Sequence, residues 1–234
     1  MKSLTKHIAE SLRIGINKCI PVMNESLRIG INDNPYSASP TTWDELRQII
    51  EDRYEKLGPG TAKEPIYFGD INVSEMTTFY DGVGLFQNTK FEYIDVSNWD
   101  TSNVKDMHRM FEKCINLKSV GDLSNWDVSQ VENICLMFRN CSKLEFIGDL
   151  SNWNISKVEY TYGMFDYCEK LESIGDLSDW NTSKVEDMSN MFFNCKNLKS
   201  VGDLNKWDVY GGCIIRNMFT NSGIKNIPTN WYKI

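Results

Sequence analysis

The sequence predicts an α/β fold, a solenoid of about six strand-helix units of 27 residues with parallel strands and a helical N-terminal cap. Tryptophan recurs every 27 residues, apolar residues follow it at steps of three and four, and a Gly-Asp pair precedes the next tryptophan. A fixed period of this length indicates units that bury their apolar edges against neighbours. The repeated tryptophans are Trp99, Trp126, Trp153, Trp180 and Trp207.

A helix is expected in the first half of each unit. Steps of three and four between apolar residues are typical of a helix with one buried face. Serine followed three residues later by glutamate forms a capping box, in which the two side chains bond the free amides at the start of a helix. The apolar positions of one unit are Val104, Met107, Met110, Phe111 and Cys114, and the capping boxes are Ser129 with Glu132, Ser156 with Glu159 and Ser183 with Glu186.

A short strand is expected in the second half, where "LKSVGDLSNW" places an apolar residue at every third position. The glycines in this segment are expected to supply a backbone angle that a side chain would forbid. They are Gly121, Gly148, Gly175 and Gly202.

The repeated apolar side chains are predicted to form the core, with stacked indoles as its central column. The cysteines are interpreted as small buried residues, while disulfides between neighbours are the alternative in an oxidising compartment. The predicted core consists of the five tryptophans with Met110, Met137, Met164, Met191, Phe111, Phe138, Phe165, Phe192, Cys114, Cys141, Cys168 and Cys195.

The stretch "FEKCINLKSVGDLSNWDVSQVENICLMF" resembles the BspA-like leucine-rich repeat, also called the bacterial surface protein repeat. The resemblance covers about residues 66–234. Members of that family are usually exported or lipid-anchored surface proteins associated with adhesion. The resemblance therefore implies a leucine-rich-repeat fold with a binding role.

Two regions are predicted. Residues 1–62 form a helical segment and cap, of which 1–34 is a candidate flexible tag because "ESLRIGIN" occurs at 10–17 and again at 25–32. Within the cap, "TTWDELRQIIEDRYEKLGPG" predicts a helix capped by Thr42 that covers the first unit. Its apolar stripe consists of Trp43, Leu46, Ile49, Ile50, Tyr54 and Leu57. Residues 63–234 form the solenoid, and its atypical last unit is predicted to be a C-terminal cap.

Composition narrows the function classes. The 234 residues carry a net charge of -7, which comes wholly from residues 66–234 and argues against binding to nucleic acid. The N-terminus shows no secretory signal or lipid-attachment site, and no stretch is apolar enough for a membrane span, so cytoplasmic synthesis is expected. The histidines His7 and His108 have no catalytic partner identifiable by spacing. We therefore expect a non-catalytic protein without a metal or cofactor.

The candidate binding residues are those that vary between units. Two positions after the strand leucine change from unit to unit, and Phe146 is the only aromatic residue among them. An apolar anchor in a polar rim is typical of interface hot spots, although single exposed apolar residues are also common. The predicted partner-binding residues are Lys118, Ser119, Glu145, Phe146, Glu172, Ser173, Lys199 and Ser200.

A column of aspartates follows the repeated glycines. Such side chains most simply accept hydrogen bonds from backbone amides of their own turn. Ca²⁺ binding is a weak alternative because the D-x-D-x-D spacing of a calcium-binding loop is missing. The column consists of Asp70, Asp122, Asp149, Asp176 and Asp203.

The sequence therefore predicts a protein-binding scaffold that recognises a protein partner through its variable strand face. The alternatives are a phage-encoded virion-associated or host-directed protein, suggested by a weak likeness of residues 1–12 to phage leader segments, and a surface adhesin exported by another route. An enzyme is the least favoured class. The oligomeric state cannot be inferred from the sequence.

Overall fold

The computed structural model describes residues 37–209, 212–228 and 231. The chain divides into two compact units, Met1–Pro35 and Tyr36–Ile234, and every described residue lies in the second. The duplicated "ESLRIGIN" segments and the candidate tag at 1–34 lie outside the described residues. Tyr36–Ile234 is therefore described by itself, and from here on a "unit" is one repeat of the sequence.

The predicted cap helix is confirmed as α2, Trp43–Leu57. The Thr42 side chain accepts a hydrogen bond from the Glu45 amide, and the Glu45 carboxylate accepts from the Thr42 amide, so the helix begins with a complete capping box. Gly58 ends it with a φ of 73°. Leu46 and Ile50 are fully buried, whereas Leu57 is 62% exposed and does not belong to the buried stripe.

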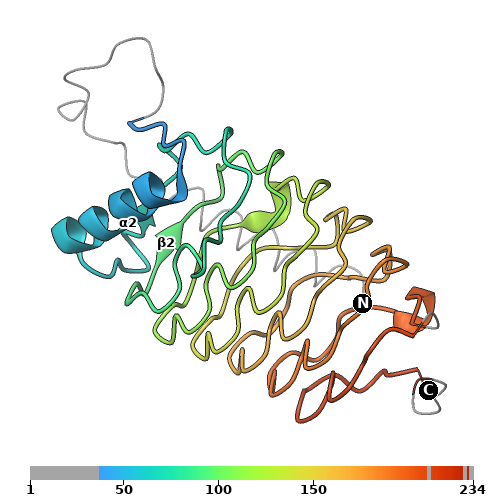
Figure 1. Ribbon diagram of the computed structural model, residues 1–234. Coiled ribbons are helices and arrows are strands. Elements are labelled where there is room, and N and C mark those ends of the chain that lie inside the picture. Colours follow the sequence, from blue (N-terminus) through green and yellow to red (C-terminus); the bar gives the residue numbers. More distant parts are fainter. Residues whose placement is uncertain (1–36, 210–211, 229–230, 232–234) are drawn as a thin grey trace, which may run out of the picture. The chain divides into compact units, whose positions relative to one another are not determined.

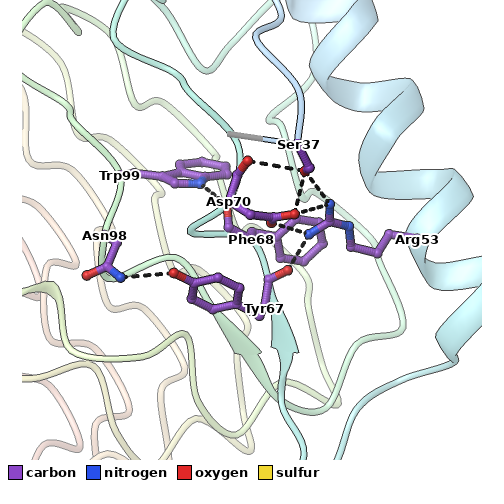
Figure 2. A network of polar contacts seen from close by, with 7 residues as sticks. All are labelled: Ser37, Arg53, Tyr67, Phe68, Asp70, Asn98 and Trp99. Atoms are coloured by element: carbon purple, nitrogen blue, oxygen red, sulfur yellow. Dashed lines mark hydrogen bonds and ion pairs between the residues drawn. The ribbon is translucent and has the colours of Figure 1, made fainter. Parts of the chain in front are cut away.

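Helix α2 covers the first unit of the repeats through the polar network in Figure 2. Arg53 reaches from the helix to the Asp70 carboxylate, with N···O distances of 2.7 and 3.1 Å, and its Nη1 also donates to the Tyr67 carbonyl. Its guanidinium lies 5.1 Å from the centre of the Phe68 ring. Ser37 donates to the same carboxylate. Arg53 therefore joins helix α2 to the first unit through an ion pair, a hydrogen bond to the backbone and a ring contact.

The predicted solenoid of about six strand-helix units is wrong. In the described residues the only α-helix is α2, and the only strands are the two-residue parallel pair β1 (Ile66–Tyr67) and β2 (Ile94–Asp95). Beyond them the units consist of turns, the short 3-10 helices η2 (Leu123–Asn125) and η3 (Leu204–Lys206), and isolated bridges, which are parallel except for the one between Tyr80 and Gly84. Figure 1 shows these stretches of chain lying side by side after β2.

Hydrogen bonding between neighbouring units explains why no helix forms. In an α-helix the amide of Phe111 would bond four residues back, but it donates to Met137 in the next unit at 2.8 Å. The amide of Lys113 likewise donates to Arg139 at 2.7 Å. Within a unit the bonds span three residues, as from Cys114 to Phe111 at 3.2 Å. A spacing of three and four therefore reflects successive turns.

Left-handed residues also interrupt each predicted helix. Arg109 and Lys113 have φ values of 55° and 60°, and Leu136 has 57°, so no helical run can pass through them. The serines of the predicted capping boxes open turns instead of helices, because the Ser129 amide donates to the Asp127 side chain at 2.9 Å. The amides of Ser156 and Ser183 donate to Asn154 and Asn181 in the same way.

The central column of the core consists of stacked indoles. Trp126 and Trp153 have ring centres 6.5 Å apart with parallel planes, and each of the five repeated tryptophans is at most 3% exposed. Each indole N–H donates to a carbonyl of the preceding unit, as from Trp153 to Leu123 at 2.9 Å. Each ring therefore joins two units through both stacking and a hydrogen bond.

Two further columns flank the indoles. Phe111 and Phe138 stack with ring centres 5.1 Å apart, and Phe165 and Phe192 continue the row. The thiol of Cys141 donates to the Phe111 carbonyl at 3.0 Å, and this bond recurs from Cys114, Cys168 and Cys195. The cysteines of the column are buried free thiols. The methionines Met110, Met137, Met164 and Met191 are buried beside them.

Candidate partner-binding face

The variable positions lie on one continuous face. Parallel bridges join Tyr93 to Ser119 and Ser119 to Phe146, so equivalent residues of three units are neighbours in space. We call this surface the partner face. It consists of Glu92 and Tyr93 together with the predicted residues Lys118, Ser119, Glu145, Phe146, Glu172, Ser173, Lys199 and Ser200.

The serines of the partner face shape the turn that follows them. The Ser119 hydroxyl accepts a hydrogen bond from the Gly121 amide at 3.2 Å. Ser173 and Ser200 accept from the glycines two residues further on at 3.4 and 3.2 Å. Since these hydroxyls satisfy a backbone donor, their repetition has a structural cause.

Phe146 departs from this pattern. Its ring cannot accept the bond, and the Gly148 amide has no hydrogen-bond partner among the described residues. The side chain is 39% exposed. Position 146 therefore lacks a turn hydrogen bond and presents an aromatic ring to solvent.

The charged half of the partner face is partly engaged within the protein. Lys118 Nζ lies 2.7 Å from the Glu92 carboxylate and 5.2 Å from the centre of the Tyr93 ring. The hydrogen bond between Lys118 and Glu92 raises the pKa of Lys118 and lowers the pKa of Glu92. Glu145, Glu172 and Lys199 are exposed. Lys118 therefore holds a fixed position, whereas the other charges face solvent.

Sequence reasoning missed Glu92 and Tyr93, because the first unit is degenerate. In that unit "FEYI" stands where later units read "LKSV" or "LEFI". The bridge from Tyr93 to Ser119 establishes the equivalence. Alignment of the two acidic residues Glu92 and Glu145 could have found the match.

The aspartate column serves the turns beside the partner face. The Asp122 carboxylate accepts the Ser124 amide at 3.0 Å, and equivalent bonds recur at Asp149, Asp176 and Asp203. The glycine of the next unit lies against this carboxylate with a positive φ, so a Cβ on Gly148 would fall 2.0 Å from Asp122 Oδ1. Within the described ranges, no group of three or more His, Cys, Asp or Glu residues is placed to hold a metal ion.

The described histidine is packed against a neighbouring ring. His108 lies 4.5 Å from Tyr80 between ring centres, and its amide donates to the Asp106 carboxylate at 2.8 Å. Burial lowers the pKa of His108, and the charge of Arg109 acts in the same direction. His7 lies outside the described residues.

These features define a repeat protein in which successive units stack through matched columns of side chains. Residues 81–175 and 145–233 each match the family described as "Mycoplasma protein of unknown function, DUF285". The matches together extend over more than half of the chain, and the chain belongs to this family. Their overlap agrees with the internal repetition. No curated protein and no solved structure shows a significant match.

Across the part of the chain that the structure describes, no helix has the length and apolar character needed to cross a membrane.

Proposed function

We propose that the chain is a non-catalytic protein-binding scaffold of the BspA-like surface-repeat type, which recognises a protein partner through its partner face. The observation that carries this proposal is Phe146, where an exposed ring replaces a serine that would bond the following glycine amide. The chain gives up a local hydrogen bond at this position. Binding of a partner would account for that choice.

The surroundings of Phe146 support a contact with another protein. Hot spots in interfaces are aromatic or basic side chains within a polar rim that excludes water. Glu145 and Glu172 lie on the rim, and the Lys118 side chain is held by Glu92. Charges in such positions mainly govern partner choice and association rate. The face therefore combines an anchor with elements of specificity.

A surface adhesin is the second candidate. Its support is the resemblance of the repeated motif to the BspA-like family together with membership of the matched Mycoplasma family. In that case the chain is exported and the same face binds a partner at the cell surface, whereas the first proposal fits cytoplasmic synthesis equally well. The phage interpretation depends on residues 1–12, which lie outside the described residues, and the family match gives it no support.

The non-catalytic assignment is supported by the engaged state of the repeated polar side chains. The column serines and aspartates bond backbone amides of their own turns. His108 packs against Tyr80. A nucleophile needs a base within hydrogen-bond reach and a site for the reacting atom.

Photo-crosslinking tests the proposal. We would replace Phe146 with p-benzoylphenylalanine, irradiate the full chain with cell extracts or intact cells, and identify the crosslinked protein by mass spectrometry. The same replacement of Tyr160 is the matched control, because that ring is 38% exposed in another column. The partner is then purified, and its affinity is measured for the wild type and for Phe146→Ser and Tyr160→Ser.

The proposal predicts a partner captured at position 146 alone and an affinity that falls about tenfold or more in Phe146→Ser. Equal capture at both positions, or equal affinity of the two variants, would show that the partner face is not the binding surface.

A further inference from the structure

A second surface lies on the turn that precedes the partner face. It is a hollow of about 530 Å³, within the size range of pockets that take a side chain or small ligand. Buried Phe91, Leu117 and Leu144 separate it from the partner face along the chain. We call it the lysine hollow. It is lined by Asn88, Thr89, Lys90, Lys113, Ile115, Asn116, Asn140, Ser142 and Tyr167.

Two exposed apolar side chains line the lysine hollow. Ile115 is 55% exposed and Tyr167 is 40% exposed. The Tyr167 ring contacts Phe193 with ring centres 5.5 Å apart, which holds it at the wall. An apolar side chain of a partner that enters the hollow would remove part of this apolar surface from water.

The charge around the lysine hollow is opposite to that of the whole chain. Lys90 and Lys113 are exposed, and neither makes an ion pair within the described part of the chain. The lining of the hollow contains these two lysines and no acidic residue, whereas the chain has a net charge of -7. The local potential therefore favours a ligand with negative charge.

The backbone gives a further sign of selection at this surface. Lys113 and Tyr167 belong to a column whose other members are asparagines, and all members have a φ between 55° and 62°. Asparagine tolerates this left-handed conformation, whereas lysine and tyrosine adopt it at a cost. The two non-asparagine residues are both in the lysine hollow. The column as a whole contains Asn88, Lys113, Asn140, Tyr167, Asn194 and Asn221.

We propose that the lysine hollow binds a short acidic peptide segment of a partner protein. One apolar side chain of the segment packs on Ile115 and Tyr167, and its carboxylates pair with Lys90 and Lys113. The asparagine amides that line the hollow can bond the peptide backbone.

A short segment fits better than an extended polyanion. Nucleic acid or an anionic membrane would also face the acidic remainder of the chain and be repelled by it. A peptide of a few residues stays within about 10 Å of the lysines, where screening by salt weakens the distant charges. This inference does not depend on Phe146, because the lysine hollow contains no residue of the partner face.

Fluorescence polarisation with the full chain tests the inference. The probe is a labelled peptide of glutamate and aspartate residues around one phenylalanine, with a second peptide in which serine replaces the phenylalanine. The test variants are Lys113→Asn and Tyr167→Asn, which restore the residue typical of the column and are expected to melt no lower than the wild type. The controls are Lys184→Asn and Tyr160→Asn, which remove an exposed lysine and an exposed ring elsewhere.

The inference predicts that each test variant weakens binding about fivefold or more, that the controls and Phe146→Ser bind like the wild type, and that added salt weakens binding. Equal binding by test and control variants would overturn it. Equal affinity for the two peptides would remove the apolar anchor and overturn the proposed mode. Binding to phosphatidylserine vesicles through Lys113 without binding to the peptide would show that the ligand is a lipid surface.

Discussion

Truncation of one indole tests the stacked core most sharply. Trp153 is 3% exposed, stacks on Trp126 and donates from its indole nitrogen to the Leu123 carbonyl at 2.9 Å. The substitution Trp153→Ala removes the ring, the stacking contact and the hydrogen bond together. Trp153→Phe keeps an aromatic ring and removes the N–H donor.

The magnitudes follow from these contacts. Loss of a buried tryptophan to alanine costs about 3 to 5 kcal/mol, because the cavity adds to the lost burial. For Trp153→Phe we expect about 1 to 2 kcal/mol, from one neutral hydrogen bond and a small loss of volume. The Leu123 carbonyl still accepts the Trp126 amide at 3.1 Å, so it is not left without a partner.

Urea unfolding followed by circular dichroism measures both variants, since the free energy extrapolates linearly to water. The matched control is Tyr160→Ala, which removes a 38% exposed ring and should change stability by about 0.5 kcal/mol or less. If Trp153→Ala lost no more stability than Tyr160→Ala, the stacked column would not support the fold.

Three other predictions concern backbone, charge and thiols. Gly175→Ala should lower the free energy of unfolding by about 2 to 4 kcal/mol, because the new Cβ would lie 1.8 Å from Asp149 Oδ1. Its control is Gly212→Ala, whose Cβ would have no atom within 4 Å and which should cost only about 1 to 2 kcal/mol of backbone strain. Equal losses of the two variants in urea unfolding would rule out the close approach at Gly175. Burial alone would raise the pKa of Asp70, but hydrogen bonds from Arg53 and Ser37 hold it below its usual 3.8. The contribution of the Asp70 carboxylate to the free energy of unfolding is therefore present above about pH 4 and is lost as pH falls through the lowered pKa. This pH dependence should vanish in Asp70→Asn when stability is measured from about pH 2 to 6. A pH profile of that variant identical to the wild-type profile would contradict this assignment. Burial raises the pKa of Cys135 to about 12 and the pKa of Cys213 to about 11. Both thiols should therefore react slowly with a disulfide reagent at pH 8 until urea unfolds the chain. Rapid reaction before unfolding would show that the thiols are accessible.

The period and the core columns could be predicted from the sequence, because each unit must present the same apolar edge to its neighbour. The conformation inside a unit could not. A spacing of three and four satisfies both an α-helix and a run of three-residue turns, and the choice depends on where the amides bond. Lys113 and Leu136 have a left-handed conformation that the sequence does not indicate, because neither residue type favours it. Asn140 and Asn194 gave the available signal, since asparagine tolerates that conformation.

The candidate face could be predicted in position but not in detail. Variation between units identified Phe146 and its neighbours. The role of Ser119 depends on a bond to the Gly121 amide, and the fixed position of Lys118 depends on Glu92 in a degenerate unit. The first fact needs the backbone geometry of a turn within one unit, and the second needs the pairing of units in space. The lysine hollow was missed because its residues come from four turns that are far apart in the sequence.

The most direct test of the account compares stability and partner capture for Phe146→Ser. In this account the columns of repeated side chains stabilise the fold, and residues that differ from the repeat recognise partners. The free energy of unfolding of Phe146→Ser should then lie within about 1 kcal/mol of the wild-type value, since serine can accept a hydrogen bond from the Gly148 amide as Ser119 does from Gly121. It should also lose the partner captured at position 146. A variant that is strongly destabilised yet keeps the partner would contradict the account.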